Sequence, residues 1–343
     1  MSRIKSRSGR LVANPYAAGP AQGFVIMKKN QWIALFLFLL AVMPVFGKTV
    51  NIKKVGEYPN FLAVSPDGKT AYVTSYGTGE LIEVDLVKKI VTRAVAIGVA
   101  PLGITLAGTG KTAFVACKET GTVAVVNLET FRVEADIKVG GSPNAVAVDA
   151  RGYRLFVTNF GRTKEGLLHI IDARDYRVTS TMKMGISPIA LTVSPTTGSV
   201  YVVNGGINEV WVVDPERQAV TKKIPVGDTP DGIAITPNGE RLFVANSRSH
   251  DLSVIDTKLG DVMLTVPVGK MPFGVAVSPD GKRVFVVNTQ SRNVSVLPTD
   301  LSSLQATTLS VERGPVGIQV APDGQTILVV NEQSHSLSVV DVR

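Results

Sequence analysis

Residues 230–269 read PDGIAITPNGERLFVANSRSHDLSVIDTKLGDVMLTVPVG. Four segments of this stretch alternate apolar with polar residues and are rich in β-branched side chains. Such segments, separated by turn residues, are typical of β-strands. In the first turn, PNG at 237–239, proline fixes φ and glycine accepts the positive φ that closes a hairpin. The stretch therefore predicts four antiparallel strands joined by tight turns.

The same pattern recurs along the chain. Its second segment returns as AYVTS at 71–75, AFVAC at 113–117, LFVTN at 155–159, VYVVN at 200–204, LFVAN at 242–246, VFVVN at 284–288 and ILVVN at 327–331. A proline opens each unit, with spacings of 42 to 45 residues: Pro59, Pro101, Pro143, Pro188, Pro230, Pro272 and Pro315. Four strands in about forty residues are the signature of a β-propeller blade. The repeats predict an all-β, seven-bladed propeller of four-stranded antiparallel blades over residues 48–343.

The two ends of this repeat region complement each other. The last unit stops at SLSVVDVR, residues 336–343, after its third strand. Residues 48–56, KTVNIKKVG, resemble EADIKVG at 134–140, which is the fourth segment of the second unit. We therefore expect the N-terminal strand at 49–56 to complete the last blade and close the ring, which removes an exposed sheet edge.

A column of mostly small residues runs through the first strand of each unit. We expect these residues to let neighbouring sheets interdigitate near a crowded axis. The column consists of Ala63, Thr105, Ala147, Thr192, Ala234, Ala276 and Gln319.

The net charge of +8 is unevenly distributed. Residues 1–47 contain six of the 36 basic side chains and no acidic one. Residues 48–343 therefore carry 30 basic against 28 acidic side chains, a net charge of only +2. This near-neutral balance argues against a nucleic-acid partner, because such binding depends on neutralising phosphates.

Residues 27–47 have the layout of a secretory signal peptide. MKKN at 27–30 is a basic start, and WIALFLFLLAVMPVF at 32–46 is an apolar run that ends near small residues, which predicts cleavage before Lys48. A membrane anchor is the alternative, but spanning takes about twenty apolar residues. We therefore expect a periplasmic or secreted protein with no stable membrane insertion after cleavage. Residues 1–26 are interpreted as an extension upstream of a start at Met27.

The YVTN-like strand, the SPDG turn at 65–68 and 278–281, and the VG…P junction together resemble the YVTN-type β-propeller repeat family. The resemblance covers residues 49–343. It implies a seven-bladed propeller and an exported bacterial or archaeal protein. It implies no particular activity, because many members of that family have none that is known.

Candidate site residues lie where the repeats differ, at the two loop sets that share one end of the ring. After the repeat prolines, Asp231 is the only charge in its column, so it could bind a cation, act as a base or simply be solvated. Binding candidates from this column are Asn60, Asn144, Asp231 and Phe273. The loops after the second strands add Tyr76, Arg162, Lys164, Arg248, His250, Arg292 and His335.

Other recurrent polar residues have structural explanations. The Asp that ends the third strand is expected to cap the next turn, as is the Asn that ends the second strand, although five Asn copies could also line a polar surface. His169 lies within a strand and is expected to be a core residue. His250 and His335 could share a metal with Asp231, but no local ligand motif supports this, so no metal and no cofactor are predicted.

Catalytic signatures are missing from the sequence. It has no Gly-x-Ser-x-Gly elbow, no phosphate-binding loop before a helix and, with Cys117 alone, no Cys-x-x-Cys-His haem motif. We therefore predict an exported, non-catalytic and monomeric binding or scaffold module for a protein, a cell-envelope component or a small molecule.

Two other classes remain open. One is a periplasmic hydrolase or lyase of the lactonase-like propeller type, with Asp231, His250, Arg248 and His335 at one mouth, or a cofactor-bearing redox subunit. The other is a DNA-binding propeller, which would need Arg162, Lys164, Arg248 and Arg292 to cluster.

Overall fold

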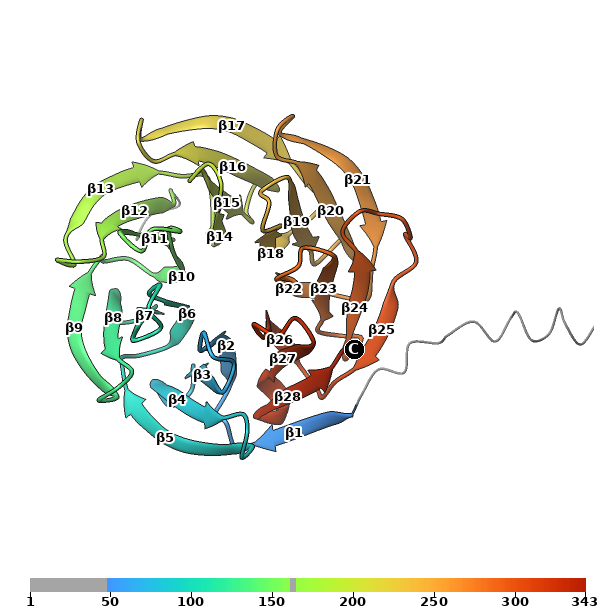
Figure 1. Cartoon of the computed structure of the whole chain (residues 1–343). Helices are drawn as coiled ribbons and strands as arrows, with labels where there is room; N and C mark the ends of the chain where they lie inside the picture. The colour runs from blue at the N-terminus through green and yellow to red at the C-terminus, as the bar shows by residue number, and fades with distance from the viewer. Residues whose placement is uncertain (1–47, 161–164) are drawn as a thin grey trace, which may run out of the picture. The chain divides into compact units, whose positions relative to one another are not determined.

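The structure is a computed structural model that describes residues 48–160 and 165–343. Over these ranges the chain forms seven four-stranded antiparallel sheets in a ring, which confirms the predicted fold (Figure 1). No helix within the described ranges is long and apolar enough to cross a membrane. The predicted leader, residues 1–47, and the candidates Arg162 and Lys164 lie outside the described residues.

Blades 1 to 6 take their strands in sequence order from the axis outward, and blade 7 takes β26, β27 and β28 in this order with β1 as its outermost strand (Figure 1). Blade 1 contains β2 (Pro59–Val64), β3 (Thr70–Ser75), β4 (Glu80–Asp85) and β5 (Ile90–Ala96). Blade 2 contains β6 (Pro101–Leu106), β7 (Thr112–Cys117), β8 (Thr122–Asn127) and β9 (Arg132–Lys138). Blade 3 contains β10 (Pro143–Val148), β11 (Arg154–Asn159), β12 (Leu167–Asp172) and β13 (Val178–Lys183).

The remaining blades follow the same order. Blade 4 contains β14 (Pro188–Val193), β15 (Val200–Asn204), β16 (Glu209–Asp214) and β17 (Ala219–Pro225). Blade 5 contains β18 (Pro230–Ile235), β19 (Arg241–Asn246), β20 (Asp251–Asp256) and β21 (Asp261–Pro267). Blade 6 contains β22 (Pro272–Val277), β23 (Arg283–Asn288), β24 (Asn293–Pro298) and β25 (Thr307–Ser310). Blade 7 contains β26 (Pro315–Val320), β27 (Thr326–Asn331), the 3-10 helix η1 (Glu332–Ser334), β28 (Ser336–Asp341) and β1 (Thr49–Lys53).

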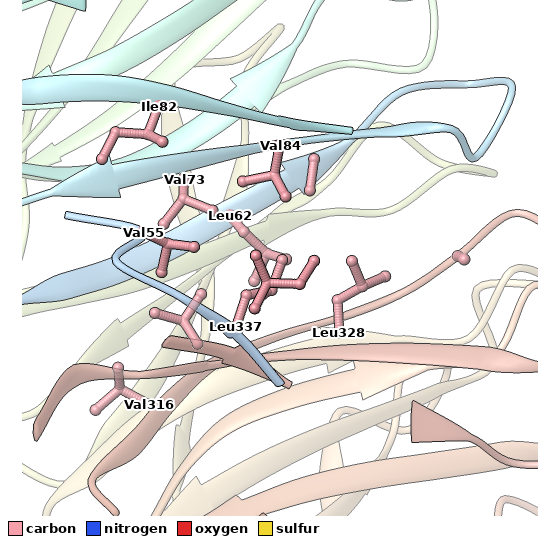
Figure 2. Packing of buried hydrophobic residues seen from close by; sticks show 12 residues of the cluster. Val55, Leu62, Val73, Ile82, Val84, Val316, Leu328 and Leu337 are labelled. Atoms are coloured by element: carbon pink, nitrogen blue, oxygen red, sulfur yellow. The ribbon is translucent and has the colours of Figure 1, made fainter. Parts of the chain in front are cut away.

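Strand β1 closes the ring as predicted. It pairs antiparallel with β28, with Thr49 opposite Val340 and Ile52 opposite Leu337. The strand ends at Lys53, three residues earlier than the predicted segment, because Lys54 has a positive φ of 60° and turns the chain toward blade 1. Figure 2 shows the cluster of buried side chains that spans this seam, from Val55, Leu62, Val73, Ile82 and Val84 to Val316, Leu328 and Leu337.

The small column of the inner strands lies opposite the aromatic residue of the second strand. In blade 5, Ala234 pairs with Phe243, whose ring is fully buried against Val284 and Val286 of the next blade. Where the second strand instead carries Leu328, its partner is the larger Gln319. In six of the seven blades the small residue therefore makes room for an aromatic ring at the interface between blades, which explains the predicted interdigitation.

The tightest glycine position between blades lies two residues earlier in the inner strand. A Cβ on Gly232 of β18 would lie 1.9 Å from the Phe273 carbonyl oxygen of β22, so no larger residue fits without separating the strands. Glycines with a similarly close backbone neighbour from the next inner strand occupy this position in three other blades: Gly103, Gly274 and Gly317.

The turn chemistry is as predicted. Gly239 has a φ of 74° in the PNG turn of blade 5, and its amide donates to the Thr236 carbonyl. At the end of the third strand, Asp256 accepts two backbone amides, from Lys258 and Leu259, both at 2.8 Å. Equivalent turn-capping aspartates are Asp85, Asp172, Asp214 and Asp341.

Candidate functional site

One end of the ring, which we call the junction face, carries the residues before each repeat proline and the loops after each second strand. Backbone hydrogen bonds join these two loop sets. In blade 5, the Ser247 amide donates to the Thr229 carbonyl at 2.8 Å and the Arg248 amide to the Asp228 carbonyl at 3.1 Å. In blade 5 the backbone of the loop after the second strand is thus fixed to the junction.

The asparagines that end the second strands are buried and form no polar surface. In blade 5, Asn246 Nδ2 donates to Asp251 Oδ1 at 2.6 Å and to Ser253 Oγ at 2.9 Å. A Cβ on Gly227, in the VG junction above it, would lie 2.6 Å from the same Nδ2. In blades 5 and 6 these asparagines, Asn246 and Asn288, therefore tie the second strand to the third beneath a junction glycine, which corrects the expectation that their side chains cap the following turn.

His250 and His335 are turn residues with backbone partners. Both have a positive φ, 61° and 49°. His250 Nδ1 lies 3.2 Å from the Met271 amide nitrogen and 2.9 Å from the Ser247 carbonyl oxygen, so backbone engages this nitrogen in either tautomer. His335 Nδ1 similarly lies 3.3 Å from the Tyr58 amide nitrogen. These imidazoles hold each loop to the next junction.

The inner strands enclose a cavity of about 170 Å³ at the axis. Its walls come mainly from the second, third and fourth residues of these strands, including Phe61, Ile189, Asp231 and Phe273, and Gln319 adds the fifth residue of β26. Asp231 is the only ionisable side chain in the lining. Neither His250 nor His335 lines it, so the cavity does not bring Asp231 together with the two imidazoles, an arrangement that the sequence left open.

The carboxyl group of Asp231 is half-buried. Burial raises the pKa of Asp231 above its ordinary value, and a hydrogen bond from Ser247 offsets only part of this rise. The raised pKa means that the ionised carboxylate lacks a compensating positive charge. Across the cavity, the rings of Phe61 and Phe273 lie with centroids 6.4 Å apart.

The other sequence candidates are dispersed over the junction face. Asn144 Nδ2 donates to the Ile189 carbonyl of the next blade at 2.9 Å, which makes it a structural bridge. Asn60 is half-buried at the equivalent position in blade 1, while Tyr76 and Arg248 are exposed on separate loops.

Arg292 and His335 do share a groove, at the rim between blades 6 and 7. Arg313 and Lys53 lie in the same groove, and Glu312 forms an ion pair with Lys53 there. This mixed-charge groove is separate from Arg248, so the described candidates do not build the continuous basic patch that DNA binding needs.

Nucleophilic and metal-binding arrangements are not found among the described residues. No group of three or more His, Cys, Asp or Glu side chains within 48–160 and 165–343 could hold a metal ion. Cys117 is fully buried, and burial raises its pKa to about 12, so its thiolate is not available at neutral pH. His169 is a core residue as predicted, with its ring nitrogens 3.2 Å from Asn159 Nδ2 and 3.0 Å from Thr181 Oγ1.

Sequence reasoning missed Phe61. It occupies the third position of its strand, where the other blades have Gly or Ala: Gly103, Ala145, Ala190, Gly232, Gly274 and Gly317. A lone aromatic residue in a column of the smallest side chains was the available signal.

Comparisons with known proteins agree with the fold. A family described as YNCE-like beta-propeller matches residues 189–300, which span blades 4, 5 and most of blade 6. None of the curated proteins matches the chain. Among solved structures, a chain of hydrazine synthase from Kuenenia stuttgartiensis is similar, with a TM-score of 0.76 and 19% identity, over 85% of this chain and 98% of that one. At this identity the likeness concerns the fold alone.

Proposed function

We propose that this protein is a non-catalytic binding module that holds a partner on its junction face. The chain belongs to the YVTN-type β-propeller repeat proteins. One observation carries this proposal: large apolar side chains are exposed beside the repeat prolines. Tyr58, Val99, Ile186 and Met271, from four different blades, are between 38% and 58% exposed. Exposed apolar side chains on one face, rimmed by polar loops, are typical of protein interaction surfaces.

The surroundings of the imidazoles and of Asp231 also support a binding function over a catalytic one. Acid–base chemistry needs a titratable group within hydrogen-bond reach of a substrate. Here the imidazoles of His250 and His335 contact backbone, and Asp231 lines its cavity without a second ionisable group. The rigid loop backbones suit recognition because little conformational entropy is lost on binding.

Affinity capture with the full chain tests the proposal. Val99→Ser, Ile186→Ser and Met271→Ser combined should lose a stoichiometric partner that the wild type retains. The matched control is Val87→Ser with Leu259→Ser, since both residues are highly exposed, at 70% and 65%, in turns at the opposite end of the blades. Equal retention by both variants, or turnover of a metabolite by a chain that captures no partner, would reject the proposal.

We also propose that the protein acts outside the cytoplasm, as a monomer. The apolar run at 32–46 supports export, and cleavage before Lys48 would leave β1, which begins at Thr49, intact to close the ring. Cell fractionation and the mass of the mature chain test this. A cytoplasmic protein that retains residues 27–47 would contradict it.

A hydrolase of the lactonase-like type is the second candidate, favoured only by Asp231. A half-buried carboxyl with a raised pKa in an axial cavity has the environment of a general base. Screening the chain against lactones, with Asp231→Asn as the comparison, tests this candidate: hydrolysis that survives the substitution would remove it.

A further inference from the structure

The axial cavity has an unusual combination of one carboxylate and two aromatic rings. Asp231 supplies the only charge, Phe61, Phe273 and aliphatic side chains such as Ile189 supply the apolar part of the wall, and Gln319 and backbone groups supply the rest. The lining contains no Lys, Arg or His. An anionic ligand would therefore meet a carboxylate with no compensating cation, and a neutral apolar ligand would leave that carboxylate desolvated.

We propose that this cavity binds a compact alkylated ammonium ion, with its positive charge beside the Asp231 carboxylate and its methyl groups against Phe61 and Phe273. The proposal deepens the binding function given above by naming the ligand class at the channel mouth. It rests on the proposed function in one respect, because both hold that the protein binds its ligand and does not transform it.

The aromatic geometry suits a cation. A cation is attracted to an aromatic face when it lies within about 6 Å of the ring centroid. Because the centroids of Phe61 and Phe273 are 6.4 Å apart, one ion can satisfy this distance to both rings. The two rings come from different blades, with blade 7 between them, and they approach across the glycine column of the inner strands.

Metal cations fit the cavity less well. Ca²⁺ takes about six to eight oxygen ligands and Mg²⁺ about six, whereas Asp231 is the only carboxylate in this lining. A primary ammonium would need three hydrogen-bond acceptors, but an ammonium whose hydrogens are replaced by methyl groups needs none. Alkylation thus matches the two aromatic rings of the wall, against which methyl groups can pack.

The volume sets the size of the ligand. A cavity of about 150 Å³ accommodates benzene, with six non-hydrogen atoms. The axial cavity, at about 170 Å³, therefore accommodates a trimethylammonium group with a short substituent. Burial raises the pKa of Asp231, and a bound cation would supply the compensating charge that this carboxylate lacks.

Isothermal titration calorimetry of the full chain with choline tests the proposal, at constant ionic strength. We expect a Kd on the order of 1 mM, given the ligand's small size. The neutral isostere 3,3-dimethylbutan-1-ol, which has the same shape without the charge, should bind at least about tenfold more weakly. Absence of choline binding at 50 mM, or equal binding of the isostere, would overturn the proposal.

Two variants locate the site. Asp231→Asn should weaken choline binding about tenfold or more, and Phe273→Leu about fivefold, because the latter removes a ring but keeps the apolar contact. Asp228→Asn is the matched control, since Asp228 is a nearby junction carboxylate that does not line the cavity. Equal weakening by Asp228→Asn would mean a diffuse electrostatic effect and would refute the assigned site.

The outcomes separate this proposal from the proposed function. If Asp231→Asn failed to fold, the choline and isostere titrations of the wild type would still decide the ligand class. Loss of choline binding with intact capture of a partner by the junction face would overturn the cation site alone. Choline binding without a captured partner would leave the cation site standing and remove the protein-binding function.

Discussion

Substitution of Gly232 by alanine should destabilise the ring at the tightest glycine position between two blades. The added Cβ would lie 1.9 Å from the Phe273 carbonyl oxygen, whereas Cβ atoms in proteins are essentially never found within 3.0 Å of another heavy atom. Strands β18 and β22 must therefore separate by about 1 Å, and this type of overpacking costs about 3 kcal/mol. In a domain of this size, that cost should lower Tm by about 6 °C.

Differential scanning calorimetry at one scan rate measures this shift, with Gly108→Ala as the matched control. Gly108 lies in an exposed turn, and a Cβ there meets no atom within 4 Å. Alanine at this position should leave Tm unchanged or raise it slightly, because it reduces the entropy of the unfolded chain. A Gly232→Ala variant that unfolds within about 1 °C of the control would refute the close contact between inner strands.

Three further predictions concern single residues. Ellman's reagent should leave Cys117 unmodified in the native chain at pH 8, because burial raises its pKa to about 12, and should modify one thiol per unfolded chain. Ile52→Ala should cost about 2–5 kcal/mol of stability and increase amide exchange in β28, because Ile52 is buried in the closing seam opposite Leu337; unchanged exchange would contradict this. The raised pKa of Asp231 contributes stability that is present below the ordinary pKa of 3.8 and is lost as pH rises through the native pKa. Asp231→Asn should therefore gain in Tm relative to the wild type at pH 7 but not at pH 3, and an equal difference at both would contradict the assigned shift.

The blades could be predicted because their determinants are local and repeated. Glycine, with proline in five of the seven blades, specifies the first hairpin of each blade, and alternation of apolar with polar residues specifies the strands, so the repeats predicted the fold. Ring closure followed because residues 48–56 resemble the fourth strand that the last repeat lacks. The register of β1, with Ile52 opposite Leu337, then agrees with the buried face that this resemblance implies.

The cavity could not be predicted because each inner strand is irregular at its start. In blade 5, the pairing of β18 with β19 shifts between Pro230 and Gly232. In blade 1, the corresponding shift lies between Pro59 and Leu62. Strict alternation would place only every second residue on the axis. The bulge turns three successive positions toward it, which is why Phe61 lines the cavity together with Asp231 although the two occupy different columns.

The asparagines were misread for a related reason. Sequence spacing places Asn246 next to a turn, where its side chain would ordinarily cap backbone amides. In the folded blade, the VG glycine of the same repeat covers this side chain and directs it toward Asp251 and Ser253 of the third strand. The partner comes from tertiary packing, which no local pattern encodes.

The loop histidines and Asp231 differ in how the chain offsets the cost of their positions. The histidines occupy a loop position with a positive φ. This loop position has a φ between 49° and 61° in four blades, where it is occupied by Asn208, His250, Arg292 and His335. Blades 1 and 2 have glycine at the same position. A residue other than glycine costs about 1 kcal/mol in the left-handed region. Such a residue is favoured there when its side chain forms a local interaction that offsets this cost. Asn208 and both histidines do so by accepting a junction amide. Asp231 has a hydrogen bond with Ser247 but no ionisable partner in the cavity lining, so a bound cation would supply the charge that its carboxylate lacks.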